Sequence, residues 1–418
     1  MTSHQVQLLF VDLALILLLA RGLGHLAALV LQPPVVGEIL AGVLLGPTLL
    51  NGAITDALFP PDIRPLLAGM ANVGVALFMF GVGLEIDTES LRGRGRVTAV
   101  SAAGSTAVPF ALGIGLAFCL PRGGRTDHPV AFAVFIGLAV SVTAFPVLAR
   151  ILADRGLSRT ALGGIALATA ACVDIVAWTA LAAVQATVAG GRHWTVALIV
   201  PFVALMLLVA RPLLRKVLTP GGKAAAITPR TFSVVLVGAL LSATATEAMG
   251  LHFIFGAFLF GLVMPRHGAR VQRTEVLDHT GRLTSVLLPV YFVVAGLQVD
   301  LSEIGGARLV QLGAILLVAV VGKFGGTYFA ARSQGLPPRA AGALGALMNT
   351  RGLTELVILG IGLQLGLLDG PLYSLMVVMA VVTTAMTGPL LSRIYAKPVE
   401  VQRPAGERQA DPATASRS

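Results

Sequence analysis

The sequence predicts an all-α integral membrane protein, and three observations support this fold class. The chain has 418 residues, of which 56% are hydrophobic and only 12% are charged. Its mean hydropathy is +0.87, and its apolar residues gather in runs long enough to cross a bilayer as helices. Soluble domains are about 25% charged. The composition therefore excludes a soluble enzyme, and we expect neither enzymatic activity nor a bound cofactor or resident metal.

The apolar runs number about thirteen, and each is a candidate transmembrane helix. They lie at roughly 7–31, 35–50, 64–86, 97–120, 129–153, 161–189, 194–218, 230–248, 251–266, 280–300, 307–332, 338–366 and 371–395. The residues that follow, 397–418, are polar and too few to fold alone. We therefore expect a transmembrane domain over 1–396 and a short disordered cytoplasmic tail over 397–418.

The basic residues orient the chain in the membrane. With the N-terminus outside, the connectors on the inner side hold 23 of the 30 Lys and Arg residues, and those on the outer side hold five. This bias predicts an N-out, C-in topology. A net charge of +10 could instead indicate a nucleic-acid-binding protein. Such proteins gather their basic residues on one face of a folded domain, whereas here they lie in short connectors, so we expect the lipid bilayer and not nucleic acid as partner.

Two motifs recur along the chain and predict a duplicated unit. The motif Gly-Leu-Glu-Ile-Asp at 83–87 returns as Gly-Leu-Gln-Val-Asp at 296–300, an offset of 213 positions, and Gly37 and Gly42 return as Gly256 and Gly261, an offset of 219. By the charge bias the two copies have opposite orientation. An inverted repeat is typical of secondary transporters, whose substrate site lies near the membrane midplane where discontinuous helices meet. Chance recurrence in glycine-rich runs is the alternative.

Polar groups interrupt two apolar runs at matching places. In the fifth run Ser141 and Thr143 come just before Pro146, which has no N–H to donate to a helix. About 208 positions later the twelfth run is interrupted by Asn349, Thr350, Arg351 and Gly352. An ordinary proline kink would explain the first interruption alone, but the matched pair predicts two broken helices. Freed carbonyls and hydroxyls at such breaks can coordinate a dehydrated cation.

Asp174 lies near the middle of the sixth run, where a carboxylate is costly unless it is paired, protonated or exposed to water. Removal from water favours its protonated form, and an entering Na+ or K+ favours its ionised form. A group that binds either a proton or a cation is by itself an exchange mechanism. The alternative is a carboxylate that is merely paired in the core.

The other charges inside the runs are candidates for pairing, gating or a place on the ion pathway. Lys323 could form a structural ion pair or take part in gating. Arg351 and Glu355 are four positions apart, so they share a helix face and are expected to stabilise the broken helix as a pair. Glu38 near the start of the second run could pack the helix or contribute to the ion pathway.

Four ungapped motifs carry a resemblance to a known family. They lie at 32–47, 141–150, 255–258 and 344–356. Over about residues 5–395 the chain resembles the monovalent cation:proton antiporter-2 family, including its plant-type cation/H+ exchangers. The resemblance implies a thirteen-helix fold with a dimerisation domain and a core domain, two crossed broken helices, a homodimer in the plasma membrane, and elevator-like movement of the core.

The resemblance also implies roles for particular residues. Asp174 falls on the family's essential aspartate, Lys323 on its membrane lysine, and Ser141 and Thr143 on the break that helps to form the cation site. Many members have Asp or Asn before the essential aspartate, where this chain has Val173. We therefore expect one carboxylate per cycle and electroneutral 1:1 exchange. A direct pair between Lys323 and Asp174 is a second hypothesis.

The sequence thus predicts an antiporter that exchanges Na+ or K+ for H+ and contributes to pH homeostasis. One alternative is a potassium-efflux system, although such systems usually carry a nucleotide-binding regulatory domain and the tail after Tyr395 is too short for one. Another alternative is an organic-anion symporter on the same scaffold, with Lys323 and Arg351 attracting the anion. Selectivity among Na+, K+ and Li+ depends on the size of the cavity, which the sequence does not define.

Overall fold

The structure is a computed structural model, and it describes residues 2–30, 32–48, 52–85, 95–120, 128–157, 160–188, 198–218, 227–265, 270–302 and 305–395. Over these ranges the chain is helical and contains no β-strand. The helices of the first half are α1 (Ser3–Leu29), α2 (Pro34–Leu45), α3 (Ala53–Leu58), α4 (Arg64–Glu85), α5 (Gly95–Cys119), α6 (Pro129–Ser141), α7 (Phe145–Asp154) and α8 (Ala161–Val188). Those of the second half are α10 (Ile199–Leu205), the π-helix η2 (Met206–Ala210), α11 (Arg211–Leu218), α12 (Pro229–Ala248), α13 (Phe253–Val263), α14 (Arg270–Leu297), α15 (Gly306–Ser333), α16 (Pro338–Met348), α17 (Leu353–Gln364) and α18 (Gly370–Ile394).

The described helices confirm an all-α membrane protein. Among them, nine are long and apolar enough to cross a bilayer, or up to ten if the bent pair α16 and α17 is one span. The helices α2 and α13 are apolar but shorter, with 12 and 11 residues. Length and composition in these ranges therefore establish fewer crossings than the thirteen predicted. The predicted tail, 397–418, lies outside the described residues.

Local sequence signals set several helix starts. Proline occupies the first position of α2, α6, α12 and α16, where a missing N–H leaves no intrahelical hydrogen bond unmade. Asp369 caps α18, because its Oδ1 accepts a hydrogen bond of 2.8 Å from the backbone N–H of Leu372. Thr2 and Gln5 form a capping box at the start of α1.

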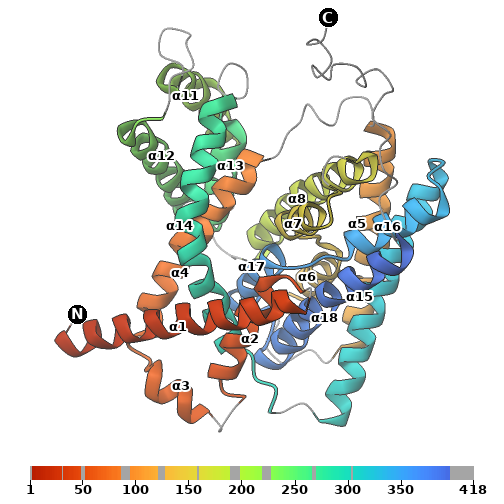
Figure 1. Ribbon diagram of the computed structural model, residues 1–418, viewed down its shortest axis with the longest axis horizontal. Coiled ribbons are helices and arrows are strands. Elements are labelled where there is room, and N and C mark those ends of the chain that lie inside the picture. Colours follow the sequence, from red (N-terminus) through yellow and green to blue (C-terminus); the bar gives the residue numbers. More distant parts are fainter. Residues whose placement is uncertain are drawn as a thin grey trace, which may run out of the picture.

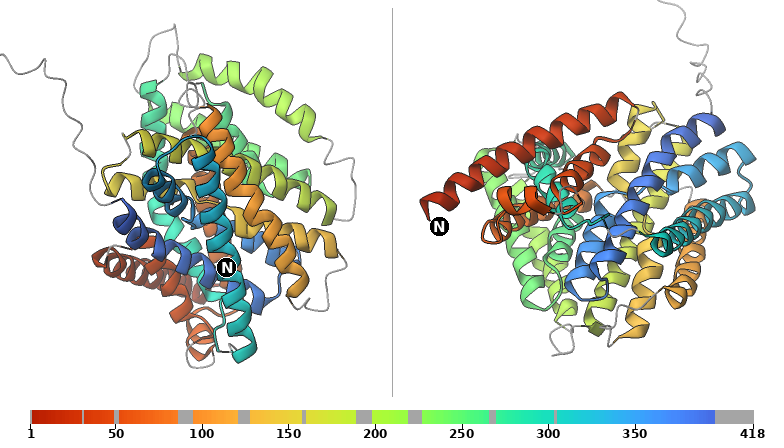
Figure 2. Two further views of the ribbon diagram at one scale, coloured as in Figure 1. Left: turned by 90° about the vertical axis from the view of Figure 1, so that its right-hand side faces the viewer. Right: turned by 90° about the horizontal axis from the view of Figure 1, so that it is seen from below.

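The helices form two bundles, which Figure 1 shows on the two sides of the molecule. One, the scaffold bundle, consists of α1, α2, α4, α12, α13 and α14, with η2 and α11 packed against α13 and α12. The other, the crossing bundle, consists of α5 to α8 and α15 to α18. Within it α5 and α15 lie side by side (Figure 2). The bundles meet where α14 contacts α17 and where α2 contacts α18.

The repeated glycines make the same helix contact twice, and each contact joins the two copies. On α2 a Cβ at Gly42 would lie 2.7 Å from the Cα of Gly296 on α14, and on α13 a Cβ at Gly261 would lie 3.1 Å from the backbone of Gly83 on α4. Only glycine permits backbones to approach so closely. The glycine helix of each copy therefore packs against a helix of the other copy. These reciprocal contacts support a two-fold relation between duplicated halves.

Candidate functional site

Two broken helices cross in the middle of the crossing bundle. The first break, residues 142–144, separates α6 from α7, and the second, residues 349–352, separates α16 from α17, whose axes differ by 43°. Both breaks fall where the polar interruptions predicted them.

Two hydrogen bonds join the breaks. The Thr143 hydroxyl donates to the carbonyl of Met348 at 2.9 Å, and the backbone N–H of Ala144 donates to the carbonyl of Thr350 at 3.0 Å. Each break therefore satisfies backbone groups that the other exposes, which is how irregular backbone is tolerated at membrane depth. The crossing brings together residues that are more than two hundred positions apart.

The sequence explains where the second half of each broken helix begins. Pro146 is the second residue of α7, at a position where a helix has no use for its N–H. Gly352 precedes α17 as its N-terminal flanking residue in an extended conformation, with φ 164°. Glu355 lies in the first turn of α17, where the positive end of the helix dipole favours a carboxylate.

Arg351 closes the end of α6. Its guanidinium donates to the carbonyls of Ala139 at 2.9 Å and Val140 at 2.6 Å, and it forms an ion pair of 3.0 Å with Glu355. Both charged side chains are 0% exposed. The spacing predicted this pair, but its geometry differs from the prediction: Arg351 lies in the break and not on the helix face that carries Glu355.

Lys323 on α15 binds the next carbonyl of the same helix end. Its ammonium donates to the carbonyl of Ser141, and the side chain is fully buried. The last three carbonyls of α6 thus accept hydrogen bonds from two cations, which suits the negative end of a helix dipole. Lys323 and Asp174, both in the described part of the chain, form no ion pair within 4.0 Å, so the structure does not show the direct pair of the second hypothesis.

Asp174 on α8 is a buried carboxylate without a hydrogen-bond partner on either oxygen. It is 1% exposed and lies near the backbone N–H of Phe145, at the start of α7, and within the electrostatic field of Lys323. The preceding residue, Val173, is also buried. The crossing therefore places the Asp174 carboxylate beside the positive end of α7, and position 173 supplies no second carboxylate there.

Further oxygen atoms line the breaks. The hydroxyl of Ser141 donates to the carbonyl of Leu138 at 2.9 Å, so its oxygen keeps lone pairs for another partner, as does that of Thr143. The side-chain amide of Asn349 and the hydroxyl of Thr350 are buried and have no partner. These neutral oxygens and the Asp174 carboxylate are the chemical groups that bind a dehydrated alkali-metal ion.

The structure places Glu38 away from the breaks, on α2 of the scaffold bundle. Its Cγ would lie 3.7 Å from a Cβ at Gly24 on α1, so α1 packs against it. Arg21 on α1 and Arg150 on α7 are close enough to act on it electrostatically. Glu38 thus faces a basic residue from each bundle. This position is compatible with either of the roles that the sequence left open.

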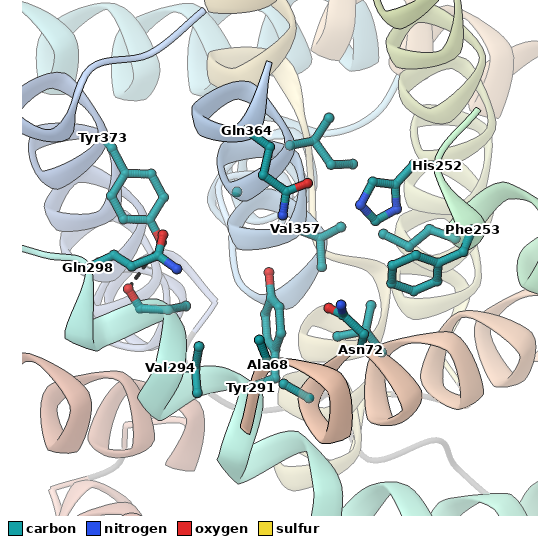
Figure 3. A pocket seen from close by; sticks show the side chains of 16 residues that line it. Ala68, Asn72, His252, Phe253, Tyr291, Val294, Gln298, Val357, Gln364 and Tyr373 are labelled. Atoms are coloured by element: carbon teal, nitrogen blue, oxygen red, sulfur yellow. Dashed lines mark hydrogen bonds between the residues drawn. The ribbon is translucent and has the colours of Figure 1, made fainter. Parts of the chain in front are cut away.

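A cavity of about 120 Å³ lies between the bundles (Figure 3). Residues of α4, α13 and α14 form one wall, and residues of α17 and α18 form the other. Its polar lining consists of Asn72, His252, Tyr291, Gln298, Gln364 and Tyr373. Val357, five residues after the second break, also lines it, so the cavity extends along α17 from Val357 towards the end of that helix.

Little in the sequence indicated this cavity. Gln298 occupies the position in the repeated motif that holds Glu85 in the first copy, so a polar residue was foreseeable there. The Tyr373 hydroxyl donates to the carbonyl of Ala295 at 3.1 Å and so joins α18 to α14 across the cavity (Figure 3). Such contacts between bundles depend on tertiary packing, which no local pattern encodes.

A duplicated helical membrane bundle with a buried carboxylate beside two crossed helix breaks has the architecture of a secondary transporter. Within the described residues, no three His, Cys, Asp or Glu side chains are grouped as the ligands of a resident metal would be.

Comparison with known proteins agrees with this class. The model of the family described as "Sodium/hydrogen exchanger, transmembrane" matches residues 13–397. The Na(+)/H(+) antiporter NhaS4 of Synechocystis sp. is 37% identical over 411 residues, which cover 95% of this chain and 100% of that protein. The chain therefore belongs to the sodium/hydrogen exchanger family.

Other relatives are longer than this chain. Cation/H(+) antiporter 20 of Arabidopsis thaliana is 38% identical over 410 residues, and K(+)/H(+) antiporter 1 of Saccharomyces cerevisiae is 35% identical over 406 residues; the chain spans 48% and 46% of their lengths. The solved structure of the sodium proton antiporter MjNhaP1 from Methanocaldococcus jannaschii matches with a TM-score of 0.69 at 12% identity, covering 94% of this chain and 100% of that one. This match shows that the two share a fold.

Proposed function

We propose that the chain is a plasma-membrane antiporter that exchanges Na+ or K+ for H+, with Asp174 binding the proton or the cation in competition. The unpartnered carboxylate of Asp174 beside the helix crossing carries this proposal. A buried carboxylate is stable when protonated or when a cation neutralises it, and the ionised form alone is costly. The relatives named above as Na(+)/H(+) and K(+)/H(+) antiporters support this substrate class.

The charges at the crossing favour electroneutral 1:1 exchange. Arg351 and Glu355 neutralise each other, and Lys323 contributes one positive charge whose ammonium is held by the Ser141 carbonyl. Asp174 carries either one H+ or one monovalent cation, so the net charge of the loaded site is the same in both halves of the cycle. No second carboxylate stands at Val173 to carry a further proton.

Oxygen atoms at the breaks complete the proposed cation site. Ser141 and Thr143 offer hydroxyl lone pairs, and Asn349 and Thr350 offer buried side-chain oxygens that lack partners. In this site Arg351, Glu355 and Lys323 position the half-helices and balance their charge, and they do not touch the transported ion. Pro146 and Gly352 keep the breaks open by starting the second half-helices.

Alternating access would come from movement of the crossing bundle against the scaffold bundle. The cavity between them lies on the side of the membrane where α14 and α17 end, and the N-out, C-in topology makes this the outer side. The same topology assigns thirteen crossings, with α2, α13 and the unit from α10 to α11 added to the ten long spans. We include a homodimer assembled through the scaffold bundle in this proposal.

The organic-anion symporter fits the site less well. The Arg351 guanidinium is bound to two carbonyls and to Glu355, and the Lys323 ammonium is bound to the Ser141 carbonyl. Neither cation of the crossing is therefore available to attract an anion without breaking buried hydrogen bonds. Asp174 would in addition repel an anion.

The test is a pH-gradient assay in inverted vesicles, with Na+, K+ and Li+ added separately across pH 6.5 to 9. We expect at least one cation to dissipate the gradient with the wild type and none to do so with Asp174→Asn. Asp62→Asn is the matched control, because this carboxylate is exposed and its contact is with Gln5. A wild type that responds to no cation, or an Asp174→Asn variant that transports normally, would refute the proposal.

Stoichiometry needs a second assay. In proteoliposomes a 1:1 exchanger reverses where the inside-to-outside concentration ratio of the cation equals that of H+, whatever the membrane voltage. Movement of a net charge would add about 2.3 kcal/mol per charge per 100 mV. A reversal point that shifts with voltage would exclude electroneutral exchange and leave the assignment as an antiporter intact.

A further inference from the structure

Three hydroxyl groups on α5 are buried and have no hydrogen-bond partner. Thr98, Ser101 and Ser105 are 2%, 0% and 0% exposed, and their side-chain oxygens contact no donor or acceptor. They are spaced by three and four residues, so they lie along one side of the helix. This side faces the interior of the crossing bundle.

Several other hydroxyls in the long helices are satisfied locally. Thr179 on α8, Thr244 on α12 and Thr383 on α18 each donate to the carbonyl four residues earlier, at 2.7, 2.9 and 2.8 Å. The same bond is open to any Ser or Thr in a helix. Three hydroxyls in one row that do not form this hydrogen bond therefore indicate a partner other than protein. Water is the partner that such buried polar groups most often bind.

The row lies on a helix that packs against the helix of Asp174. Helix α5 packs against both α8 and α15, and α8 adds a fourth buried hydroxyl without a partner, Thr169, five residues before Asp174. The pair α6 and α7 crosses once between α5 and α8, so these two helices start on the same side of the membrane. An α-helix rises about 1.5 Å per residue. Measured from the first residue of α5, Thr98 lies roughly 4.5 Å and Ser105 roughly 15 Å along the helix axis. Measured from the first residue of α8, Asp174 lies roughly 20 Å along its axis.

On the side that faces α15, helix α5 leaves no room for a hydrated metal ion. Next to the row, α5 and α15 are in backbone contact: a Cβ at Gly104 would lie 2.6 Å from the carbonyl oxygen of Gly326. A single file of water needs only two to four polar partners per molecule, which the hydroxyls and the Asp174 carboxylate supply. Lys323 on α15 also lies in this region, and its ammonium is bound to the Ser141 carbonyl.

We propose that Thr98, Ser101, Ser105 and Thr169 line a water file that carries H+ between Asp174 and the side of the membrane where α5 begins, while the metal ion reaches Asp174 between the two bundles. This inference rests on the proposed antiport. The row belongs to the crossing bundle and moves with it, so Thr98 meets the water on that side only when the bundle is displaced towards it. Movement of the bundle thus opens and closes the file, and coupling is kept.

Transport assays test the file through its hydroxyls. The double variant Ser101→Ala/Ser105→Ala should lower the maximal exchange rate in proteoliposomes about tenfold, equal to about 1.4 kcal/mol, and should leave the KM for Na+ unchanged. It should also alter the ratio of rates in H2O and D2O. Ser101→Thr/Ser105→Thr keeps both hydroxyls and should retain exchange. Thr179→Ala is the control, because that hydroxyl is satisfied by its own helix.

Cysteine labelling tests for water without relying on transport. In a variant without Cys119 and Cys172, Ser105→Cys should react with a small water-soluble thiosulfonate, and Ala103→Cys, on the exposed side of α5, should react much more slowly in the membrane. An unreactive Ser105→Cys, or a Ser101→Ala/Ser105→Ala variant with wild-type rate and isotope ratio, would overturn the file. If Asp174→Asn still abolishes exchange in that case, the proposed antiport stands and only its proton route is wrong.

Discussion

Replacing Arg351 with Met should destabilise the fold more than any other single charge change at the crossing. The guanidinium holds two carbonyls at the end of α6 and the carboxylate of Glu355, all in a region with no exposure to solvent. Removing one partner of a buried ion pair costs about 3–5 kcal/mol, because the other charge is left unpaired. We expect Arg351→Met to lower the free energy of unfolding by at least this amount.

A double-mutant cycle tests the reasoning, with unfolding measured in mixed detergent micelles. Arg351→Met/Glu355→Leu removes both charges, so it should cost less than the sum of the two single changes, with a coupling of at least about 1.5 kcal/mol. Arg64→Met is the control, because the Arg64–Asp56 pair has the same 3.0 Å length but is 45% and 78% exposed. That change should cost about 1 kcal/mol or less. Additive effects of the two buried changes, within about 0.5 kcal/mol, would refute the account of this pair.

Three further predictions follow from the packing and the charges. Gly42→Ala should destabilise the protein by about 1–3 kcal/mol through overpacking against α14. Gly81→Ala should not, because a Cβ at Gly81 has no other atom within 4 Å. Thermal unfolding of the two variants compares their stabilities. Thr384→Val should lower the free energy of unfolding by about 1–3 kcal/mol. The buried Thr384 hydroxyl accepts a hydrogen bond of 3.0 Å from the backbone N–H of Arg351 and donates one of 2.8 Å to the carbonyl of Arg351. An equal loss of stability in the exposed Thr179→Val variant would contradict this reason. Lys323→Met should slow exchange by loosening the end of α6 yet leave the reversal point independent of voltage, and a voltage-dependent reversal would show that the lysine sets the stoichiometry.

The sequence predicted the features that depend on local pattern. Pro146 lacks a donor, and the matched polar groups at 349–352 interrupt an apolar run, so both breaks were located before any geometry was known. The repeat between Gly42 and Gly261 indicated a duplication, and the structure adds what the duplication does, since each copy packs its glycine helix onto the other copy.

Contacts between distant segments could not be predicted in this way. A direct pair between Lys323 and Asp174 was one hypothesis, whereas the Lys323 ammonium donates to the Ser141 carbonyl, 182 positions earlier in the chain. The spacing of Arg351 and Glu355 predicted their ion pair, but nothing in that spacing indicated that Arg351 also binds the end of α6, more than 200 positions away. These contacts depend on how the two broken helices cross, which is a property of tertiary packing.

In the proposed antiport Asp174 exchanges one proton for one cation. Calorimetric titration of the purified protein with Na+ or K+, repeated in buffers that differ in ionisation enthalpy, gives the number of protons released for each cation bound. We expect one proton per cation for the wild type and neither binding nor release for Asp174→Asn. Cation binding without proton release in the wild type, or release that persists in Asp174→Asn, would contradict it.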